Sequence, residues 1–248
     1  MTCQCWFLYH ERYGREKYGD SYEVERVANS RLLVKEILHF LERDASWLAD
    51  KTIVSVGCGC TGDLTAFPAA VKIAVDPLLY VYQKLGLLAA DVGGGHTVYL
   101  PVGAENVPLL DDFADLIICR NALDHMPNPE IALEEFRRIL KDDGLLFASV
   151  DIGGEPTPDE PTVFSVESLR AFLNAKFTVL ALVDDYPPHS ARRACSTRTL
   201  AQQKPTLKQQ VDKEAILAAY ERQLPDETRV ALQAERARLK KAGWLPEG

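Results

Sequence analysis

The sequence lacks any uninterrupted run of the roughly 20 apolar residues that a membrane-spanning helix needs, and it has no excess of positive charge. Its 248 residues carry a net charge of −8 at pH 7. A nucleic-acid binder is usually basic or has a basic face, so we do not expect a polyanion as the partner. The first 20 residues have no apolar core after a basic start and do not resemble a signal peptide. We therefore expect a soluble protein of the cytoplasm.

The six cysteines include no C-x-x-C pair, the common spacing of zinc-binding or redox-active thiols. Two C-x-C pairs, Cys3 with Cys5 and Cys58 with Cys60, can in principle meet at one zinc ion. Structural zinc ligands usually come as C-x₂₋₄-C, however. We therefore expect no metal site, and reduced thiols in a reducing compartment.

Apolar residues make up 47% of the chain and charged residues 26%, which is a normal globular balance. Apolar and β-branched runs predict strands at residues 52–56, 71–77, 96–104, 113–122, 145–151, 177–186 and 195–203. Helical patterns occur at residues 22–43, for about two turns from Asp63, at 78–90, from 129 to a stop at Gly144, and at 165–175. Alternating strands and helices predict an α/β fold, a doubly wound and mostly parallel sheet covered on both faces.

Three segments follow from this pattern. Residues 1–50 form an N-terminal lid or cap, residues 51–204 form the sheet-containing core, and residues 205–248 form a charged helical extension. The short connection between the last two predicted strands lets them pair antiparallel. We expect the extension to pack on the core or to make a dimer contact.

The most informative stretch is a glycine-rich turn after the first predicted strand. Gly57-Cys58-Gly59-Cys60-Thr61-Gly62 fits the pattern G-x-G-x-x-G between a strand and a helix. The glycines permit a tight turn and let a ligand approach the backbone. Exposed amides at a helix start favour electronegative atoms. The motif alone is shared by sites for several ligands.

Asp76 sharpens this interpretation because it ends the next predicted strand. A carboxylate there can accept hydrogen bonds from two vicinal ribose hydroxyls, which predicts an adenosine derivative as the ligand. The alternative is a helix N-cap or a turn acid before Pro77. A nicotinamide dehydrogenase would often add a Tyr-x-x-x-Lys centre, and the occurrence of that spacing at Tyr13 and Lys17 lies before the turn. S-adenosylmethionine is the other candidate ligand.

Three blocks of sequence resemble one family. "VSVGCGCTGDL", "IAVDP" and the long block from "VGAENVPLL" to "DDGLLFAS" are similar to motifs of class I S-adenosylmethionine-dependent methyltransferases of the small-molecule type. The resemblance covers residues 50–150. It implies a Rossmann-like, seven-stranded sheet with an antiparallel last strand. It also implies methyl transfer from S-adenosyl-L-methionine to an oxygen or nitrogen of a small molecule.

The resemblance implies a cofactor site made of Gly57, Cys58, Gly59, Gly62, Asp76, Pro77, Ala104, Glu105 and Asn121. The glycine turn would wrap the methionine part, and Asp76 would hold the ribose. Pro77 would flank the adenine, and Ala104 with Glu105 would lie at its edge. Asn121 would face the transferred methyl. Two departures stand out: the third glycine comes one residue later than usual, and Gly103 replaces an aspartate found in many relatives.

His125, in "NALDHMPNP", is the candidate catalytic base, since a base helps when the acceptor is a hydroxyl. The alternative is a histidine that only shapes its loop. Asp124 is either an orienting group or a turn acid. Asp124 and Asp151 could together bind a divalent ion, but nothing in their spacing requires one, and we expect no metal.

The acceptor pocket should come from outside these motifs. Trp6, Tyr9 and Tyr13 belong to an aromatic-rich N-terminal segment that can close over a bound substrate or simply pack on the sheet. The acidic loop at residues 151–164 is the other candidate rim. A small-molecule acceptor and a possible homodimer are the expected partners. An NAD(P)-binding oxidoreductase and a non-catalytic cofactor-binding protein stay open as alternatives.

Overall fold

A computed structural model of the chain describes residues 22–204, with gaps at 61, 85, 89–90, 159 and 187–193, together with residues 230, 234, 237 and 238. The aromatic segment predicted as a lid and nearly all of the extension at 205–248 lie outside these residues. Cys3, Cys5, Tyr13 and Lys17 also lie outside them. The predicted limits of lid, core and extension therefore stay predictions.

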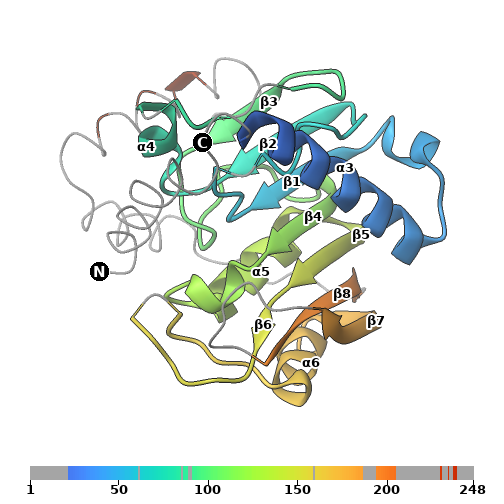
Figure 1. Cartoon of the computed structure of the whole chain (residues 1–248), viewed down its shortest axis with the longest axis vertical. Helices are drawn as coiled ribbons and strands as arrows, with labels where there is room; N and C mark the ends of the chain where they lie inside the picture. The colour runs from blue at the N-terminus through green and yellow to red at the C-terminus, as the bar shows by residue number, and fades with distance from the viewer. Residues whose placement is uncertain are drawn as a thin grey trace.

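The described part of the chain forms an eight-stranded sheet in the order β3-β2-β1-β4-β5-β8-β6, with β7 also paired to β8 (Figure 1). The strands are β1 (Thr52–Val56), β2 (Val71–Val75), β3 (Thr97–Leu100), β4 (Ala114–Arg120), β5 (Leu140–Ser149), β6 (Asp151–Ile152), β7 (Phe177–Tyr186) and β8 (Cys195–Gln203). Strands β1 to β5 pair in parallel, and β8 runs antiparallel to β5, β6 and β7. The predicted Rossmann-like sheet with an antiparallel last strand is confirmed, and the two-residue β6 is an addition to it.

Helices cover both faces of the sheet. α3 (Tyr22–Leu41) and α4 (Leu79–Lys84) lie on one face, and α5 (Pro129–Ile139) and α6 (Val166–Asn174) lie on the other (Figure 1). Two short 3₁₀ turns, η3 (Ala45–Leu48) and η4 (Leu123–His125), complete the described elements. Successive strand residues point to opposite faces. Accordingly, Ile53 and Ile118 pack in the cluster with α3, whereas Val54 and Ile117 pack in the cluster with α5.

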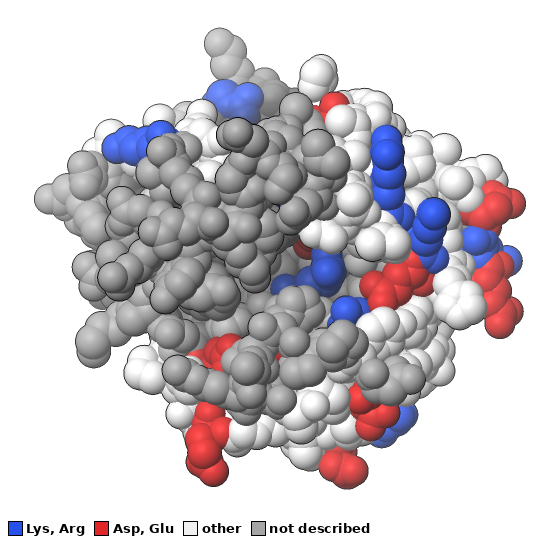
Figure 2. Space-filling view, in the orientation of Figure 1, with Lys and Arg blue, Asp and Glu red and all other residues white. Residues whose placement is uncertain are grey.

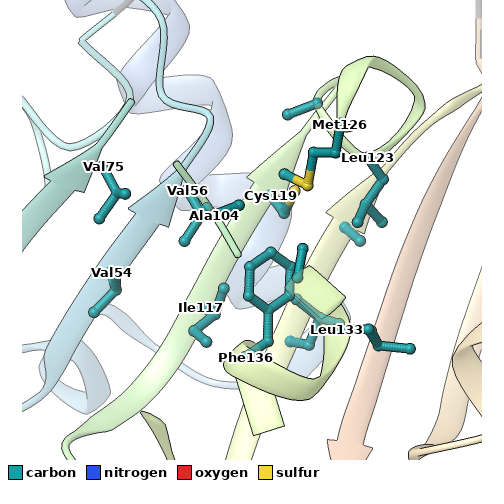
Figure 3. Packing of buried hydrophobic residues seen from close by; sticks show 14 of the residues in the cluster. Val54, Val56, Val75, Ala104, Ile117, Cys119, Leu123, Met126, Leu133 and Phe136 are labelled. Carbon is teal, nitrogen blue, oxygen red and sulfur yellow. The ribbon is translucent and has the colours of Figure 1, made fainter. Parts of the chain in front are cut away.

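The α5 face forms the larger hydrophobic core. Figure 3 shows Leu133 and Phe136 of α5 packed beside Ile117, with Leu123 and Met126 of the segment after β4 in the same cluster. All five side chains are buried. This packing fixes the segment that carries Asp124 and His125, which lie between Leu123 and Met126 in the sequence.

A buried arginine anchors the loop between β3 and β4. The Arg138 guanidinium donates to the backbone oxygens of Val107 and Leu109, at 2.8 and 2.7 Å, and to the Glu135 carboxylate, at 2.6 and 2.7 Å. Glu135 in turn accepts from the Val107 amide at 2.8 Å. Buried charges are stable only when paired and hydrogen-bonded. This network therefore holds the loop that carries Ala104 and Glu105 against α5.

Three local predictions were wrong. Residues 63–66 form turns. We had expected a helix of about two turns from Asp63, with its length limited by Pro68. The helix expected over 78–90 is confined to α4, six residues long. Gly144 does not end α5, because the helix stops at Ile139 and residue 144 lies inside β5. The chain thus passes from helix to strand without the left-handed glycine that we expected.

Candidate functional site

The glycine-rich turn lies at the carboxyl end of β1. Gly57, Gly59 and Gly62 have φ values of +67°, +56° and +67°. These values lie in the left-handed region, which residues with a Cβ rarely adopt. The amides of Gly57 and Cys58 both donate to the Val75 carbonyl, at 2.8 and 3.2 Å. The turn is therefore held against the end of β2, and the glycines adopt the tight turn that the G-x-G-x-x-G pattern predicted.

Asp76 follows β2 and joins this turn. Its Oδ2 accepts a hydrogen bond from the Gly59 amide at 2.9 Å, and its Oδ1 accepts one from the Leu78 amide at 2.8 Å. The side chain is buried, and burial raises the pKa of the carboxyl to about 6, against the lowering effect of the two amides. Each carboxylate oxygen has a further lone pair. The group can therefore still accept from a ligand hydroxyl.

The two cysteines of the turn belong to the hydrophobic cluster beneath α4. Cys58 and Cys60 are buried in a cluster with Leu79 and Tyr82 of α4. Burial raises the pKa of the Cys58 thiol, and the nearby Asp76 charge raises it further. At Cys58, only the backbone is positioned to contact a ligand over the turn.

A cavity of about 10 Å³ lies beneath the turn, lined by Gly59, Gly62, Asp63 and Tyr99 among others. Such a volume holds about one water molecule. This cavity is therefore too small to hold a nucleoside. A larger surface groove of about 830 Å³ lies between α3 and β7, and none of the predicted site residues lines it.

Helix α3 holds the turn from the side. The Arg26 guanidinium donates to the Cys60 carbonyl at 2.8 Å and also to the Leu87 carbonyl. Ser30 Oγ donates to the Asp63 carbonyl at 2.6 Å and accepts from the Ala66 amide at 2.9 Å. Sequence reasoning missed these contacts. The signal available in the sequence was the spacing of Arg26 and Ser30, which lie four residues apart and therefore on the same side of the predicted helix.

Asn121 directly follows β4 and has a φ of +45°. Asparagine tolerates this region better than most residues. The backbone amide of Asn121 donates to the Ser149 carbonyl at 2.8 Å, and its side-chain oxygen accepts from Ser149 Oγ at 3.1 Å. Gly57 packs nearby, against Ala122. The structure therefore brings Asn121 to the same sheet edge as the glycine turn.

Asp124 and His125 lie in η4 at this edge. His125 Nε2 is 3.8 Å from Asp124 Oδ1, too far for a hydrogen bond. Asp124 is buried, and its Oδ1 has no hydrogen-bond partner among the residues that the structure describes. Burial raises the pKa of Asp124 to about 6, His125 lowers it, and the charges of Glu160 and Asp151 raise it further. The acidic loop also reaches η4, since the Thr162 amide donates to the Asp124 carbonyl at 3.3 Å.

Ala104 and Glu105 lie in the loop after β3. The Ala104 side chain is buried in the core cluster on the α5 face, whereas Glu105 is partly exposed. Burial is the largest effect on Glu105 and raises the pKa of its carboxyl. Glu105 is thus the more accessible of the two for a ligand contact, and its assignment to the adenine edge stays a prediction.

Sequence reasoning also missed a charged pair across the sheet edge. Arg120, at the end of β4, donates through Nη1 to Asp63 Oδ1 at 2.9 Å. Asp63 directly follows Gly62, and its Oδ2 lies 3.5 Å from Ser55 Oγ. The available signals were a serine inside the apolar run of β1 and an arginine ending the apolar run of β4.

Among the residues that the structure describes, no group of three or more potential ligands is arranged to hold a metal ion. Figure 2 shows lysine and arginine side chains beside aspartate and glutamate side chains over the described part of the visible face. No helix within the described ranges is long and apolar enough to cross a membrane.

A comparison with known families points to the same kind of site as the strand order, the glycine turn and Asp76. Residues 54–148 match the family model described as methyltransferase domain. This part of the chain is similar to that family. The class I S-adenosylmethionine-dependent methyltransferase resemblance inferred from the sequence is thereby confirmed. The match spans β1 to β5 and includes every predicted site residue from Gly57 to His125.

Curated relatives of this chain are distant. An uncharacterized methyltransferase of Bacillus subtilis, YcgJ, is 28% identical over 149 residues, which are 59% of this chain and 56% of the relative. A ubiquinone biosynthesis O-methyltransferase of Glaesserella parasuis is 27% identical over 124 residues, 45% of this chain and 50% of the relative. The chain thus spans about half the length of the curated relatives it matches.

Solved structures share the fold of this chain. The 1,6-didemethyltoxoflavin-N1-methyltransferase of Burkholderia thailandensis, solved with its substrate and S-adenosylhomocysteine, is 17% identical with a TM-score of 0.54 over 81% of this chain and 89% of that chain. The cyclase SpnF is 16% identical with a TM-score of 0.53 over 71% and 80%. A cyclase among these neighbours means that the fold alone does not assign the reaction.

Proposed function

We propose that this protein transfers a methyl group from S-adenosylmethionine to an oxygen or nitrogen atom of a small molecule. The observation that carries the proposal is Asp76, a buried carboxylate hydrogen-bonded to the glycine turn within a methyltransferase domain. Its two oxygens can accept from a ribose diol while they keep their backbone contacts. Ligands of such sheets bind outside the carboxyl ends of the strands, where Asp76 lies.

The residues present fit an adenosine with an amino acid attached. Asp76 would hold the ribose, and Gly57, Gly59 and Gly62 would pass their backbone along the methionine part. Pro77 and Glu105 would border the adenine, and Asn121 would face the reacting end. When bound, the cofactor supplies a methyl group activated by its positive sulfur.

The protein's contribution to methyl transfer is chiefly alignment, because a neutral thioether leaves without needing a proton. The packed Leu123 and Met126 fix the position of His125. His125 would take the proton of a hydroxyl acceptor, and Asp124 would orient the imidazole once the two side chains approach within hydrogen-bond distance. Asn121 would position the methyl end through its side-chain amide, which Ser149 holds.

The acceptor is proposed to be a small molecule. The names of the Burkholderia and Glaesserella proteins, a 1,6-didemethyltoxoflavin-N1-methyltransferase and a ubiquinone biosynthesis O-methyltransferase, support this proposal. The acidic loop reaching η4 favours a neutral or cationic acceptor over a phosphorylated one. A homodimer, the absence of a nucleic-acid partner and a cytoplasmic location stay predictions from the sequence.

Calorimetry with S-adenosylhomocysteine and with NAD tests the proposal. We expect saturable binding of S-adenosylhomocysteine and no heat of binding with NAD. Binding of NAD alone would instead favour an oxidoreductase. Tight binding of S-adenosylhomocysteine without transfer of labelled methyl to any acceptor of a broad panel would favour a non-catalytic cofactor-binding protein.

The affinity for S-adenosylhomocysteine should depend on pH through Asp76. Ribose hydroxyls donate to the ionised carboxylate, and in the free protein burial raises its pKa to about 6. Binding must therefore displace a proton below that pH, so the Kd should rise by up to about tenfold per pH unit below 6 and level off above it. Asp124→Asn is the matched control, because the pKa of Asp124 is also raised to about 6. That variant should keep the pH dependence. A Kd that is constant from acid to neutral pH would contradict the assignment.

A further inference from the structure

The acidic loop at residues 151–164 is fastened at the edge of the sheet where β4 and β5 end. The Gly153 amide donates to the Phe164 carbonyl at 2.9 Å, so the two ends of the loop lie together. The Thr162 amide donates to the Asp124 carbonyl at 3.3 Å and ties the loop to η4. Ligands of such sheets bind outside the carboxyl ends of the strands. The loop and η4 therefore border the space available to an acceptor.

Asp124, in η4, is a buried carboxylate with an unused oxygen. The exposed fraction of its side chain is 2%, and its Oδ1 has no hydrogen-bond partner within the described part of the chain. His125 Nε2 lies 3.8 Å from this oxygen, which is too far for a hydrogen bond. A buried acceptor without a partner is costly, and such groups are rare in folded proteins. A donor on a bound molecule would remove that cost.

Packing on both sides fixes the place of this carboxylate. Leu123 and Met126 flank Asp124 and His125 in the sequence, and both pack in the core cluster on the α5 face (Figure 3). A shift of the η4 backbone toward another residue would unpack these two buried side chains. The structure therefore favours a partner that comes to Asp124 from outside.

Two further carboxylates decide the charge of that partner. Asp151, in β6, is buried, and Glu160, in the acidic loop, is partly exposed. Burial raises the pKa of Asp124, His125 lowers it, and the charges of Glu160 and Asp151 raise it further. Both carboxylates therefore lie within electrostatic reach of Asp124. An anionic group would be repelled at this place, and a cationic group would be attracted.

A protonated amine meets both requirements. A primary ammonium group carries a positive charge and three N–H donors. A neutral hydroxyl would supply a donor without the charge, whereas a carboxylate or a phosphate would bring a charge of the wrong sign. Each carboxylate oxygen has two lone pairs. An ammonium group and the His125 imidazole can therefore both donate to Asp124 Oδ1.

We propose that the acceptor carries a protonated amine that donates to Asp124 Oδ1, and that a different atom of the same molecule receives the methyl group. The inference rests on the function proposed above, since it presumes a methyl acceptor. An ammonium nitrogen has no lone pair for attack, and the nearby carboxylates stabilise its charged form. The methylated atom forms its bond to the methyl carbon while the carbon–sulfur bond breaks toward sulfur, and the proton that it loses goes to His125. The amine thus holds the acceptor without reacting.

Matched probes that differ at one end test the proposal. Tyramine ends in an amine, para-propylphenol in a methyl group and para-hydroxyphenylpropionate in a carboxylate, all on the same hydroxyphenyl ring. Tryptamine, with its propyl and propionate analogues, repeats the comparison on an indole. Calorimetry on protein saturated with S-adenosylhomocysteine measures their affinities. We expect each amine to bind about 10- to 100-fold more tightly than its propyl analogue, and each carboxylate to bind most weakly.

Asp124→Asn should abolish this preference for amines, because it keeps the shape of the side chain and removes its charge. The affinity for each amine should fall to that of its propyl analogue, and the affinity for S-adenosylhomocysteine should stay within about twofold. The Tm should not fall, because the substitution removes a buried charge that has no hydrogen-bonded partner at Oδ1. Glu160→Gln should reduce the preference by only about two- to fivefold, since water screens a partly exposed charge.

Asp115→Asn is the matched control for Asp124→Asn. Asp115 pairs with Lys141 at 2.8 Å, near the start of β4 and thus at the opposite edge of the sheet. That variant should keep the full preference for amines.

Each outcome has a distinct meaning. If no amine binds more tightly than its propyl analogue, or if Asp124→Asn keeps the preference, the inference is wrong. A lower Tm of Asp124→Asn with an equal loss of all probes would make the carboxylate structural and also overturn it. A labelled methyl group located by mass spectrometry on the amine nitrogen of a probe would overturn the holding role. All four results leave the proposed function intact, whereas a wild-type protein that does not bind S-adenosylhomocysteine would overturn that function itself.

Discussion

Gly57→Ala should unfold at a much lower temperature than the wild type and should lose binding of S-adenosylhomocysteine. Gly57 has a φ of +67°, and a Cβ added there would lie 2.3 Å from the Cβ of Ala122. A left-handed non-glycine residue costs about 1–2 kcal/mol, and overpacking adds about 1–3 kcal/mol. For a chain of this size the combined cost corresponds to a fall in Tm of roughly 4–20 °C. Thermal unfolding followed by circular dichroism measures it.

Gly86→Ala is the matched control for this substitution. Gly86 has a φ of +66°, but no atom of the described part of the chain lies within 4 Å of an added Cβ. Its variant therefore reports the backbone cost alone. Ala122→Gly, combined with Gly57→Ala, should recover the part of the loss that comes from the collision. If Gly57→Ala is no less stable than Gly86→Ala, the close approach of the turn to the segment after β4 is refuted.

Asp76→Asn should weaken binding of S-adenosylhomocysteine by roughly 100-fold, since hydrogen bonds to a charged group contribute about 1.5–3 kcal/mol each. An amide offers one oxygen where the carboxylate offers two, so either the ribose or the backbone amides of Gly59 and Leu78 lose an acceptor. The variant should also lose the pH dependence expected of the wild type. Calorimetry across a pH series measures both effects.

Asp115→Asn is the matched control for Asp76→Asn. Asp115 accepts from the Thr52 amide at 2.8 Å and pairs with Lys141 at 2.8 Å, at the start of β1 and thus at the opposite edge of the sheet. Its loss should leave ligand affinity unchanged. Equal affinities of Asp76→Asn and wild type would mean that this carboxylate only shapes the turn, which was the alternative left open by the sequence.

The strands were accessible from the sequence because their signals are local. The apolar run at 52–56 coincides with β1, and the runs at 177–186 and 195–203 coincide with β7 and β8. The helical pattern at 165–175 corresponds to α6, which Ser165 caps by accepting from the Ser168 amide. The motif residues from Gly57 to His125 also gather at one sheet edge, because parallel strands bring their carboxyl ends together.

What sequence reasoning missed depends on partners distant in the chain. Arg26 meets Cys60 across 34 residues, and Arg120 meets Asp63 across 57. No local pattern encodes such pairings. Gly144 was misread because glycine ends many helices, yet here the chain continues directly into β5. In each case tertiary packing decided the outcome rather than local preference.

Helix α3 begins at Tyr22 and ends at Leu41, ahead of the segment 54–148 that matches the family model. Its Arg26 and Ser30 nevertheless hold the turn that follows β1. The matched segment is therefore not a transplantable module. A chimaeric protein that joins residues 54–148 to a different N-terminal sequence must also include α3. Otherwise it must supply a guanidinium and a hydroxyl group at the positions of Arg26 and Ser30.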